Sequence, residues 1–307
     1  MERSPDISVG IVGIGLMGRG IARNIAKHGH ALVVLEHSGN QPMEDLLQAG
    51  AIAEIQASAL AAKSDLVILC VSGSPEVEAV LTGPNGVLEG VRRGTIVVDC
   101  STTIPSSTER MASLVHAAGG LFLDAPMTRT SQHAEEGRLN LLVGGDAEVL
   151  DRAMPVLRCF AENIVHVGPV GAGHRLKLLH NFMSLGSAAL LSEAAACAAS
   201  SGIQRELFVD VLATGGGAGV TLDRLKPYIL SGSSAGLQFS MGNALKDLNY
   251  YVQMATDAGA VCRIGDAVAQ TLGAAVQTGG HRADVPELVS LLADAGRQPR
   301  KHRHRSG

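Results

Sequence analysis

A glycine-rich turn lies between a β-branched run and a helical stretch near the amino end of the chain. The run covers residues 7–12 and is followed by Gly13-Ile14-Gly15-Leu16-Met17-Gly18, which opens a helix expected to end near residues 28–30. In such a turn the first glycine permits the sharp bend, the second lets the backbone approach a pyrophosphate, and the third lets the helix pack closely on the strand. The sequence therefore predicts a unit that binds a dinucleotide. The residues expected at the cofactor are Gly13, Gly15, Leu16, Met17 and Gly18.

A glutamate closes the next expected strand. Glu36 follows Gly18 by 18 residues. A carboxylate at this place can accept hydrogen bonds from both ribose hydroxyls of adenosine and would repel a 2′-phosphate. NAD is therefore predicted in preference to NADP, although the adjacent His37 leaves NADP as an alternative.

Short β-branched runs alternate with helical stretches from residue 6 to about residue 167, which is typical of a parallel sheet wrapped by helices. The expected strands are Ile7–Val12, Ala31–Leu35, Leu66–Val71, Thr95–Asp99, Leu121–Asp124, Leu139–Val143 and Ile164–Val167, with helices at Pro105–Ala118 and Ala147–Cys159 among them. We predict a doubly wound α/β domain of the Rossmann type over residues 1–167, whose strand order this pattern does not give.

The strand signal disappears after Gly173. No proline interrupts residues 172–200, so one helix of up to about 40 Å is expected there, long enough to join two domains. Further helices are expected at Arg205–Ala213, Met241–Ala258 and Gly265–Gln277, separated by glycine-rich loops. We predict an all-α domain over residues 168–296. The basic segment 297–307 is predicted to be a disordered tail, with anion or nucleic-acid binding as the alternative.

The bulk properties exclude several classes of protein. The 307 residues carry a formal net charge of −4, which gives no general attraction to nucleic acid or to an anionic membrane. The chain has five cysteines far apart in sequence, which favours reduced thiols over a disulfide framework or a metal site. We expect a cytoplasmic protein, since there is no signal-type apolar core at the amino end and no later run both long enough and free enough of charge to span a bilayer.

A lysine and an amide stand four residues apart behind a second glycine-rich turn. The run is Gly168-Pro169-Val170-Gly171-Ala172-Gly173-His174-Arg175-Leu176-Lys177-Leu178-Leu179-His180-Asn181. On a helix this spacing points Lys177 and Asn181 the same way. A lysine aimed into a cleft can give a proton to a carbonyl oxygen while a nearby amide holds that carbonyl in place.

With these motifs the chain resembles the β-hydroxyacid dehydrogenase family, which includes 3-hydroxyisobutyrate dehydrogenases and tartronate semialdehyde reductases. The resemblance extends from about Ser8 to about Ala295. The family blocks appear in order as Gly13–Gly18, Asp99–Thr102, Asp124–Thr128, Gly168–Asn181 and Lys246–Leu248.

The resemblance implies roles for individual residues. Lys177 is the expected general acid/base, and Asn181 is expected to position the substrate. The remaining implied residues are Thr102 near nicotinamide and substrate, Val71 and Ser72 in the cofactor crevice, Lys246 reaching the cofactor from the second domain, and Asp247 orienting Lys246.

The block after Asp124 departs from the family pattern. Many relatives have Ser-Gly-Gly where this chain has Thr128, Arg129 and Thr130. An arginine supplies a two-pronged donor for a carboxylate or sulfonate, so we expect these three residues to hold the acid group of the substrate. This variant is similar to sulfolactaldehyde reductases of the family. His180 stands where those relatives more often have asparagine, and it is expected to contact either the substrate or a neighbouring side chain.

These observations predict NAD-dependent hydride transfer to and from a small anionic 3-hydroxy acid. Imine reduction is an alternative, against which Lys177 argues. A non-catalytic dinucleotide-binding protein is another, against which both Lys177 and Asn181 argue. A homodimer or homotetramer is expected, because alanines on the long helix invite close packing of helices between subunits. These alanines are Ala188, Ala189, Ala194, Ala195 and Ala196.

Overall fold

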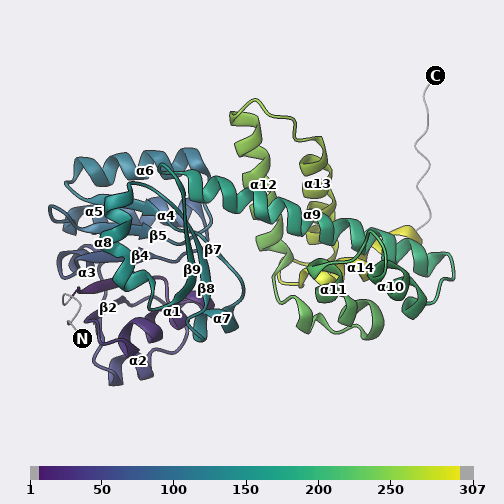
Figure 1. Ribbon diagram of the computed structural model, residues 1–307, viewed down its shortest axis with the longest axis horizontal. Helices are drawn as coiled ribbons and strands as arrows, with labels where there is room; N and C mark the ends of the chain where they lie inside the picture. The colour runs from purple at the N-terminus through teal and green to yellow at the C-terminus, as the bar shows by residue number, and fades with distance from the viewer. Residues whose placement is uncertain (1–6, 298–307) are drawn as a thin grey trace. The chain divides into compact units, whose positions relative to one another are not determined.

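The computed structural model describes residues 7–297 and divides into two compact units at the peptide between Lys177 and Leu178 (Figure 1). This division lies within the long helix α9 (Ala172–Ser200), so the first residues of that helix belong to one unit and the rest to the other. The predicted long helix is therefore confirmed. The predicted basic tail lies outside the described residues, apart from Arg297 at the end of the last helix.

The first unit is built on one sheet. Its strands are β1 (Val9–Val12), β2 (Leu32–Leu35), β3 (Ile52–Glu54), β4 (Leu66–Leu69), β5 (Ile96–Asp99), β6 (Leu121–Asp124), β7 (Met127–Thr128), β8 (Leu139–Gly144) and β9 (Ala161–Gly168). The order is β3-β2-β1-β4-β5-β6-β8-β7, with β9 paired to β8. Strands β1 to β6 are parallel, whereas β8 is antiparallel to β6 and β7. The predicted Rossmann-type sheet is thus confirmed, with an antiparallel addition at one side.

The central strands are apolar up to their last residues because both faces of the sheet are covered. Along β4, Leu66 and Ile68 belong to one buried cluster, whereas Val67 and Leu69 belong to another on the opposite face. Alternate side chains of a strand point to opposite faces, so a continuous apolar run is what a doubly covered parallel sheet requires. The covering helices are α1 (Leu16–Lys27), α2 (Glu44–Gln48), α3 (Ala57–Ala62), α4 (Ser74–Thr82), α5 (Val87–Gly90), α6 (Pro105–Ala117), α7 (Ser131–Glu135) and α8 (Ala147–Leu157).

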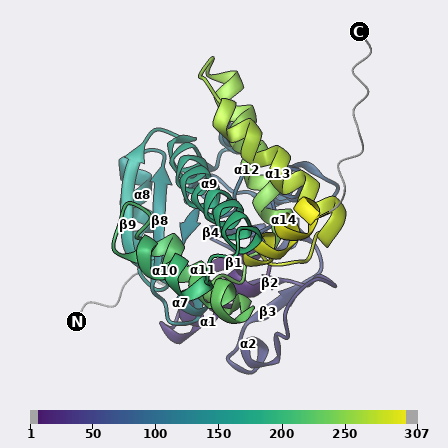
Figure 2. The same cartoon turned by 90° about the vertical axis from the view of Figure 1, so that its right-hand side faces the viewer.

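The second unit is helical, as predicted. After α9 come α10 (Arg205–Ala213), α11 (Val220–Ser231), α12 (Met241–Asp257), α13 (Arg263–Gly279) and α14 (Leu288–Arg297), with short 3₁₀ turns at Ser234–Gly236 and Val285–Glu287. Helices α12 and α13 lie side by side in both views (Figure 1, Figure 2). Their apolar faces pack on α9 around side chains such as Leu185, Leu248 and Leu272.

Four of the five alanines named on α9 pack inside the chain. Ala188, Ala189, Ala195 and Ala196 are buried and Ala194 is exposed, so the five do not form the exposed stripe on which the expected homo-oligomer depends. The large apolar side chains that α9 does expose are Leu176, Leu179, Met183 and Leu190. The homo-oligomer stays a prediction, and the packing of α9 alanines between subunits no longer supports it.

The expectation that no run is both long enough and free enough of charge to span a bilayer is wrong for helix α9. By length and composition alone it could cross a bilayer, and 44% of its most apolar window is buried in the structure. The core helix of a soluble protein passes the same test, so one such helix is weak evidence for a membrane.

Candidate active site

The glycine turn after β1 lies where the strand order of the sheet reverses. Strand β1 pairs with β2 on one side and with β4 on the other, and ligands of open α/β sheets bind outside the carboxyl ends of the strands at such a point. Gly13 has φ +97°, and a Cβ there would lie 2.2 Å from the carbonyl oxygen of Cys70. The turn after β1 and the end of β4 are therefore in direct backbone contact.

The other two glycines have distinct surroundings. A Cβ at Gly18 would lie 1.9 Å from the carbonyl oxygen of Gly13, so only glycine lets α1 pack this close to the turn. At Gly15 a Cβ would meet nothing within 4 Å. Gly15 caps α1, and no side chain bonds to the first turn of that helix. This open, amide-lined position beside a crowded turn fits the pyrophosphate of a dinucleotide.

Glu36 is the first residue after β2, at the same edge of the sheet. Its side chain is exposed, and its amide donates to the carbonyl oxygen of Glu54 at 2.8 Å. The neighbouring His37 turns into its own loop, where Nδ1 accepts from the amide of Gly39 at 3.0 Å. The carboxylate of Glu36 is thus presented to solvent beside the glycine turn, where an adenosine ribose is expected.

The loops after β4 and β5 are tied together. The hydroxyl of Ser101 accepts from the amide of Val71 at 3.1 Å, and the hydroxyl of Ser74 accepts from the amide of Ile104 at 2.9 Å. Thr102 lies between these bonds, half-buried, and its hydroxyl makes no hydrogen bond to any residue from 7 to 297. The exposed Ser72 follows Val71 on the same loop. Val71, Ser72 and Thr102 therefore follow adjacent strands at the carboxyl edge of the sheet.

Two cysteines, Cys70 and Cys100, lie at this edge of the sheet. Burial, with a contribution from the Asp99 carboxyl, raises the pKa of Cys70 to about 12, and burial raises the pKa of Cys100 well above its usual value. All five cysteines are free in the structure. Residues 7–297 contain no group of acidic, histidine and cysteine side chains suited to a metal ion. Neither a thiolate nucleophile nor a metal centre is evident in this region.

Lys177 reaches the segment that follows β6. Its Nζ donates to the carbonyl oxygen of Met127 at 2.5 Å, and the lysine is half-buried. Met127 and Thr128 form the short strand β7, where the hydroxyl of Thr128 accepts from Asn140 at 3.1 Å. The structure thus brings the predicted general acid to the predicted substrate-binding block.

Arg129 and Thr130 have protein partners of their own. Arg129 adopts φ +80°, a conformation that favours glycine. Its guanidinium donates to the Glu162 carboxylate and to the carbonyl oxygen of Arg138. The bond from Arg129 lowers the pKa of Glu162. The hydroxyl of Thr130 lies 2.8 Å from Nδ1 of His133. To bind the substrate, the Arg129 guanidinium would have to give up its ion pair with Glu162. Substrate binding by Arg129 stays a prediction.

In the second unit, Asp247 holds two of the predicted site residues. Asn181 is buried, and its Nδ2 donates to Oδ2 of Asp247 at 2.7 Å. Lys246 Nζ lies 3.0 Å from Oδ1 of Asp247 and 5.1 Å from the ring centroid of Tyr250. His180 lies with Nδ1 3.1 Å from Oδ1 of Asn181, so its partner here is the amide. The sequence indicated Asp247 as a partner of Lys246 and gave no signal that it also binds Asn181.

Replacing Asp247 by alanine should destabilise the protein by about 1–3 kcal/mol. The change leaves the buried amide of Asn181 without its acceptor, and an unsatisfied buried donor has a cost of this size. The free energy of unfolding from urea titration measures it. Asp257→Ala is the matched control, because Asp257 ends the same helix, is exposed and, among residues 7–297, bonds Gln253 alone. Equal destabilisation by the two variants would show that the Asn181 bond contributes nothing.

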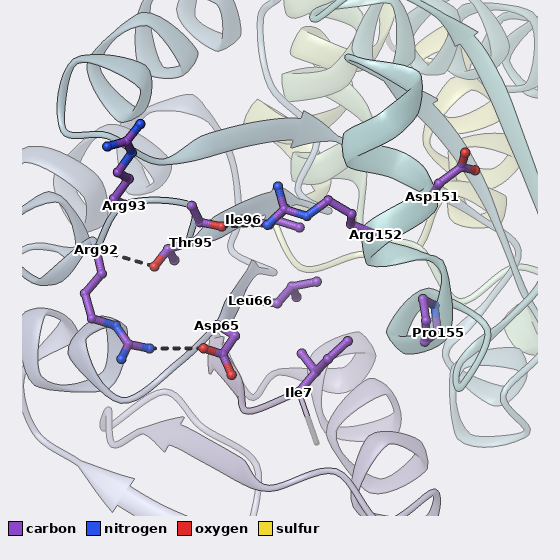
Figure 3. Close-up of a pocket in the computed structure, with 11 residues that line it drawn as sticks. Ile7, Asp65, Leu66, Arg92, Arg93, Thr95, Ile96, Asp151, Arg152 and Pro155 are labelled. Atoms are coloured by element: carbon purple, nitrogen blue, oxygen red, sulfur yellow. Dashed lines mark hydrogen bonds and ion pairs between the residues drawn. The ribbon is translucent and has the colours of Figure 1, made fainter. Parts of the chain in front are cut away.

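A separate cavity of about 810 Å³ lies at the opposite edge of the sheet. It is lined by residues that precede β4 and β5 and by part of α8, including Arg92, Arg93 and Arg152 (Figure 3). Arg92 pairs with Asp65 at 3.2 Å, and Arg152 donates to the carbonyl oxygen of Gly94 at 3.1 Å. None of the predicted site residues lines this cavity.

Comparisons with known proteins agree with this geometry. Residues 8–168 match the family described as the NAD binding domain of 6-phosphogluconate dehydrogenase. Residues 171–292 match the family described as "NAD-binding of NADP-dependent 3-hydroxyisobutyrate dehydrogenase". The chain is 32% identical over 257 residues to 2-(hydroxymethyl)glutarate dehydrogenase of Eubacterium barkeri, covering 81% of each protein. It is 30% identical over 286 residues to 3-sulfolactaldehyde reductase of Escherichia coli, covering 93% of this chain and 95% of that one.

A solved structure of Mycobacterium tuberculosis 3-hydroxyisobutyrate dehydrogenase with L-serine has the same fold, with a TM-score of 0.83 and 24% identity over 93% of this chain and 99% of that one. The glycine turn at the sheet's switch point, the helical second unit and these relatives agree, and the chain belongs to the β-hydroxyacid dehydrogenase family of NAD(P)-binding oxidoreductases.

Proposed function

We propose that the protein interconverts a small 3-hydroxy acid and its semialdehyde, with Lys177 as general acid and base. The observation that carries the proposal is the bond from Lys177 Nζ to the carbonyl oxygen of Met127. It fixes the ammonium group at the block that includes Thr128, in the same unit as the dinucleotide turn.

A bound nicotinamide cofactor would supply or accept the hydride. Lys177 gives a proton to the aldehyde oxygen during reduction and takes it back from the hydroxyl during oxidation. An ammonium group has three N–H donors, so the bond to Met127 orients Nζ with one of them. Asn181, oriented by Asp247, is the group we assign to holding the substrate.

The substrate we propose carries an anionic group. The relatives named as 2-(hydroxymethyl)glutarate dehydrogenase and 3-sulfolactaldehyde reductase act on molecules with a carboxylate or a sulfonate. Thr128 and the backbone of its block are the groups proposed to receive that acid. Arg129 is proposed to add its charge where a strong anion displaces Glu162, and His180 to contact the substrate beside Asn181.

A panel of semialdehydes tests the proposal. Succinic, tartronic, methylmalonic and sulfolactic-type semialdehydes are incubated with the protein and either NADH or NADPH, and the absorbance of the reduced nicotinamide is followed. We expect turnover with at least one acid and none with the corresponding aldehyde that lacks the acid group. Reduction of a cyclic imine without reduction of any semialdehyde would contradict the proposal, and so would tight NADH binding without turnover across the panel.

Replacing Glu36 by alanine should lower the preference for NADH over NADPH by about 10-fold or more. The carboxylate is proposed to accept both adenosine ribose hydroxyls, and hydrogen bonds to a charged group contribute about 1.5–3 kcal/mol. The ratio of kcat/KM for the two cofactors measures the change. Glu44→Ala is the control, because Glu44 is another exposed acidic residue in the following helix. An unchanged ratio in the Glu36 variant would remove this residue from cofactor selection.

A further inference from the structure

His174 is a fully buried histidine one turn before Lys177 on α9. Its Nε2 lies 3.1 Å from the carbonyl oxygen of Ser101. A carbonyl oxygen only accepts hydrogen bonds, so Nε2 carries a proton. In the neutral imidazole Nδ1 then accepts from a threonine hydroxyl, and those of Thr103 and Thr108 lie 3.0 and 2.9 Å away. Every polar atom of this ring therefore has a partner.

The backbone of His174 is held as firmly as its ring. Asp124, at the end of β6, accepts from the amide of Gly171 at 2.7 Å and from the amide of His174 at 2.9 Å. A carboxylate at this place satisfies amides at the beginning of the helix and is favoured by the helix dipole. A Cβ at Gly173 would lie 2.7 Å from the same carboxylate and 2.3 Å from the carbonyl oxygen of Leu142, so the first turn of α9 fits tightly against β6 and β8.

The ring connects this turn to the loops of the predicted cofactor site. Ser101 and Thr103 flank Thr102, the residue expected beside nicotinamide and substrate. The hydroxyl of Ser101 in turn accepts from the amide of Val71. One imidazole thus joins the helix that carries Lys177 to the loops after β4 and β5, through bonds that all lie within the first unit.

We propose that His174 is a positioning residue. It fixes where Lys177 lies along the axis of α9, and how that helix is rotated, relative to the loop that carries Thr102. The proposal rests on the proposed role of Lys177 as general acid. Its physical basis is that proton transfer depends steeply on geometry, so a displacement of about 1 Å can lower the rate about 100-fold. The surrounding charged groups are Asp99 and Asp124, whose carboxylate oxygens lie 3.9 and 3.7 Å from the ring nitrogens.

The test compares His174→Leu with His174→Gln by single-turnover hydride transfer at saturating substrate and cofactor, and by steady-state rates over a range of substrate concentrations that give KM. We expect the leucine variant to lose about 10- to 100-fold in rate with less than about 3-fold change in the KM for substrate, because substrate contacts are untouched. The glutamine variant should recover most of the rate, since its amide can donate to Ser101 as Nε2 does. Failure of glutamine to recover more than leucine would overturn the proposal.

Two further variants separate positioning from folding. Leu157→Ala removes a buried side chain of α8 outside this network, so it should lower the melting temperature and leave the rate within about 3-fold. If His174→Leu does not fold, the paired change Thr103→Val and Thr108→Val removes the hydroxyls at Nδ1 and should lower the rate about 3- to 10-fold. Rate losses that simply follow the loss of melting temperature in all variants would overturn the proposal.

A double-mutant cycle distinguishes this proposal from the proposed function. If His174 acts through Lys177, His174→Leu should have no further effect on the rate in a Lys177→Met background. Full additivity in that background, with Lys177→Met itself nearly inactive, would overturn the positioning role and leave the role of Lys177 intact. A fully active Lys177→Met variant would overturn the proposed function, and with it the basis of this proposal.

Discussion

Replacing Lys177 by methionine should lower kcat by about 10²- to 10⁴-fold. Methionine has a similar length but has no proton to give, and a positioned acid or base contributes a factor of this size. The KM for cofactor should change little, because the glycine turn and Glu36 lie on other elements of the chain. Steady-state reduction of the best semialdehyde measures kcat, and titration with NADH measures binding separately.

Arg175→Gln is the matched control for this experiment. Arg175 lies on the same helix, is exposed and pairs with Glu109, and exposed ion pairs contribute at most about 1 kcal/mol. We expect its kcat to stay within about 2-fold of that of the unchanged protein. A Lys177→Met variant as active as this control would show that proton transfer is performed by another group or by water.

The second large effect is expected from substitutions of Gly15 and Gly18, which should impair different properties of the protein. Gly15→Val should keep the fold and weaken NADH binding by about 100-fold or more, since a side chain there meets no protein atom and occupies the space proposed for the pyrophosphate. Gly18→Ala should instead destabilise the fold by about 2–3 kcal/mol, since its Cβ would meet the carbonyl oxygen of Gly13.

Two measurements separate these outcomes. The chain has no tryptophan, so unfolding is followed by far-ultraviolet circular dichroism in urea, and NADH binding is followed by calorimetry. Gly50→Ala would serve poorly as a control because its φ is +95°, whereas Gly216→Ala places a Cβ in open space of the second unit and should alter neither quantity. Unimpaired NADH binding by Gly15→Val would place the cofactor elsewhere on the protein.

The sequence predicted the parts of the fold that depend on local patterns. The buried strands β1 and β4 contain no polar side chain and β5 has only Asp99 at its end, and the absence of proline in residues 172–200 identified α9. Strand β3 was not predicted because it has three residues, two of them exposed. Strand β7 was not predicted because it has two residues. The strand order could not be predicted either, because the pairing of strands depends on packing between distant segments and not on the apolar run of each strand.

The same distinction applies to the site. The glycine turn and the spacing of Lys177 and Asn181 are local motifs and could be identified in the sequence. The bonds that orient them are not local: Met127 is 50 residues from Lys177, and Asp247 is 66 residues from Asn181. Arg129 likewise has a partner that the sequence did not indicate, because its guanidinium pairs with Glu162, which lies 33 residues away in the chain.

Because Lys177 and Asn181 belong to one uninterrupted helix, the segment between them cannot gain or lose a residue without changing their relative positions. A single inserted or deleted residue would turn everything beyond it by about 100° and shift it by about 1.5 Å, separating the acid from the amide. Related enzymes with new substrates can therefore diverge here only by exchanging side chains, as at His180, whereas an exposed loop such as Gly215–Gly219 can lengthen or shorten freely.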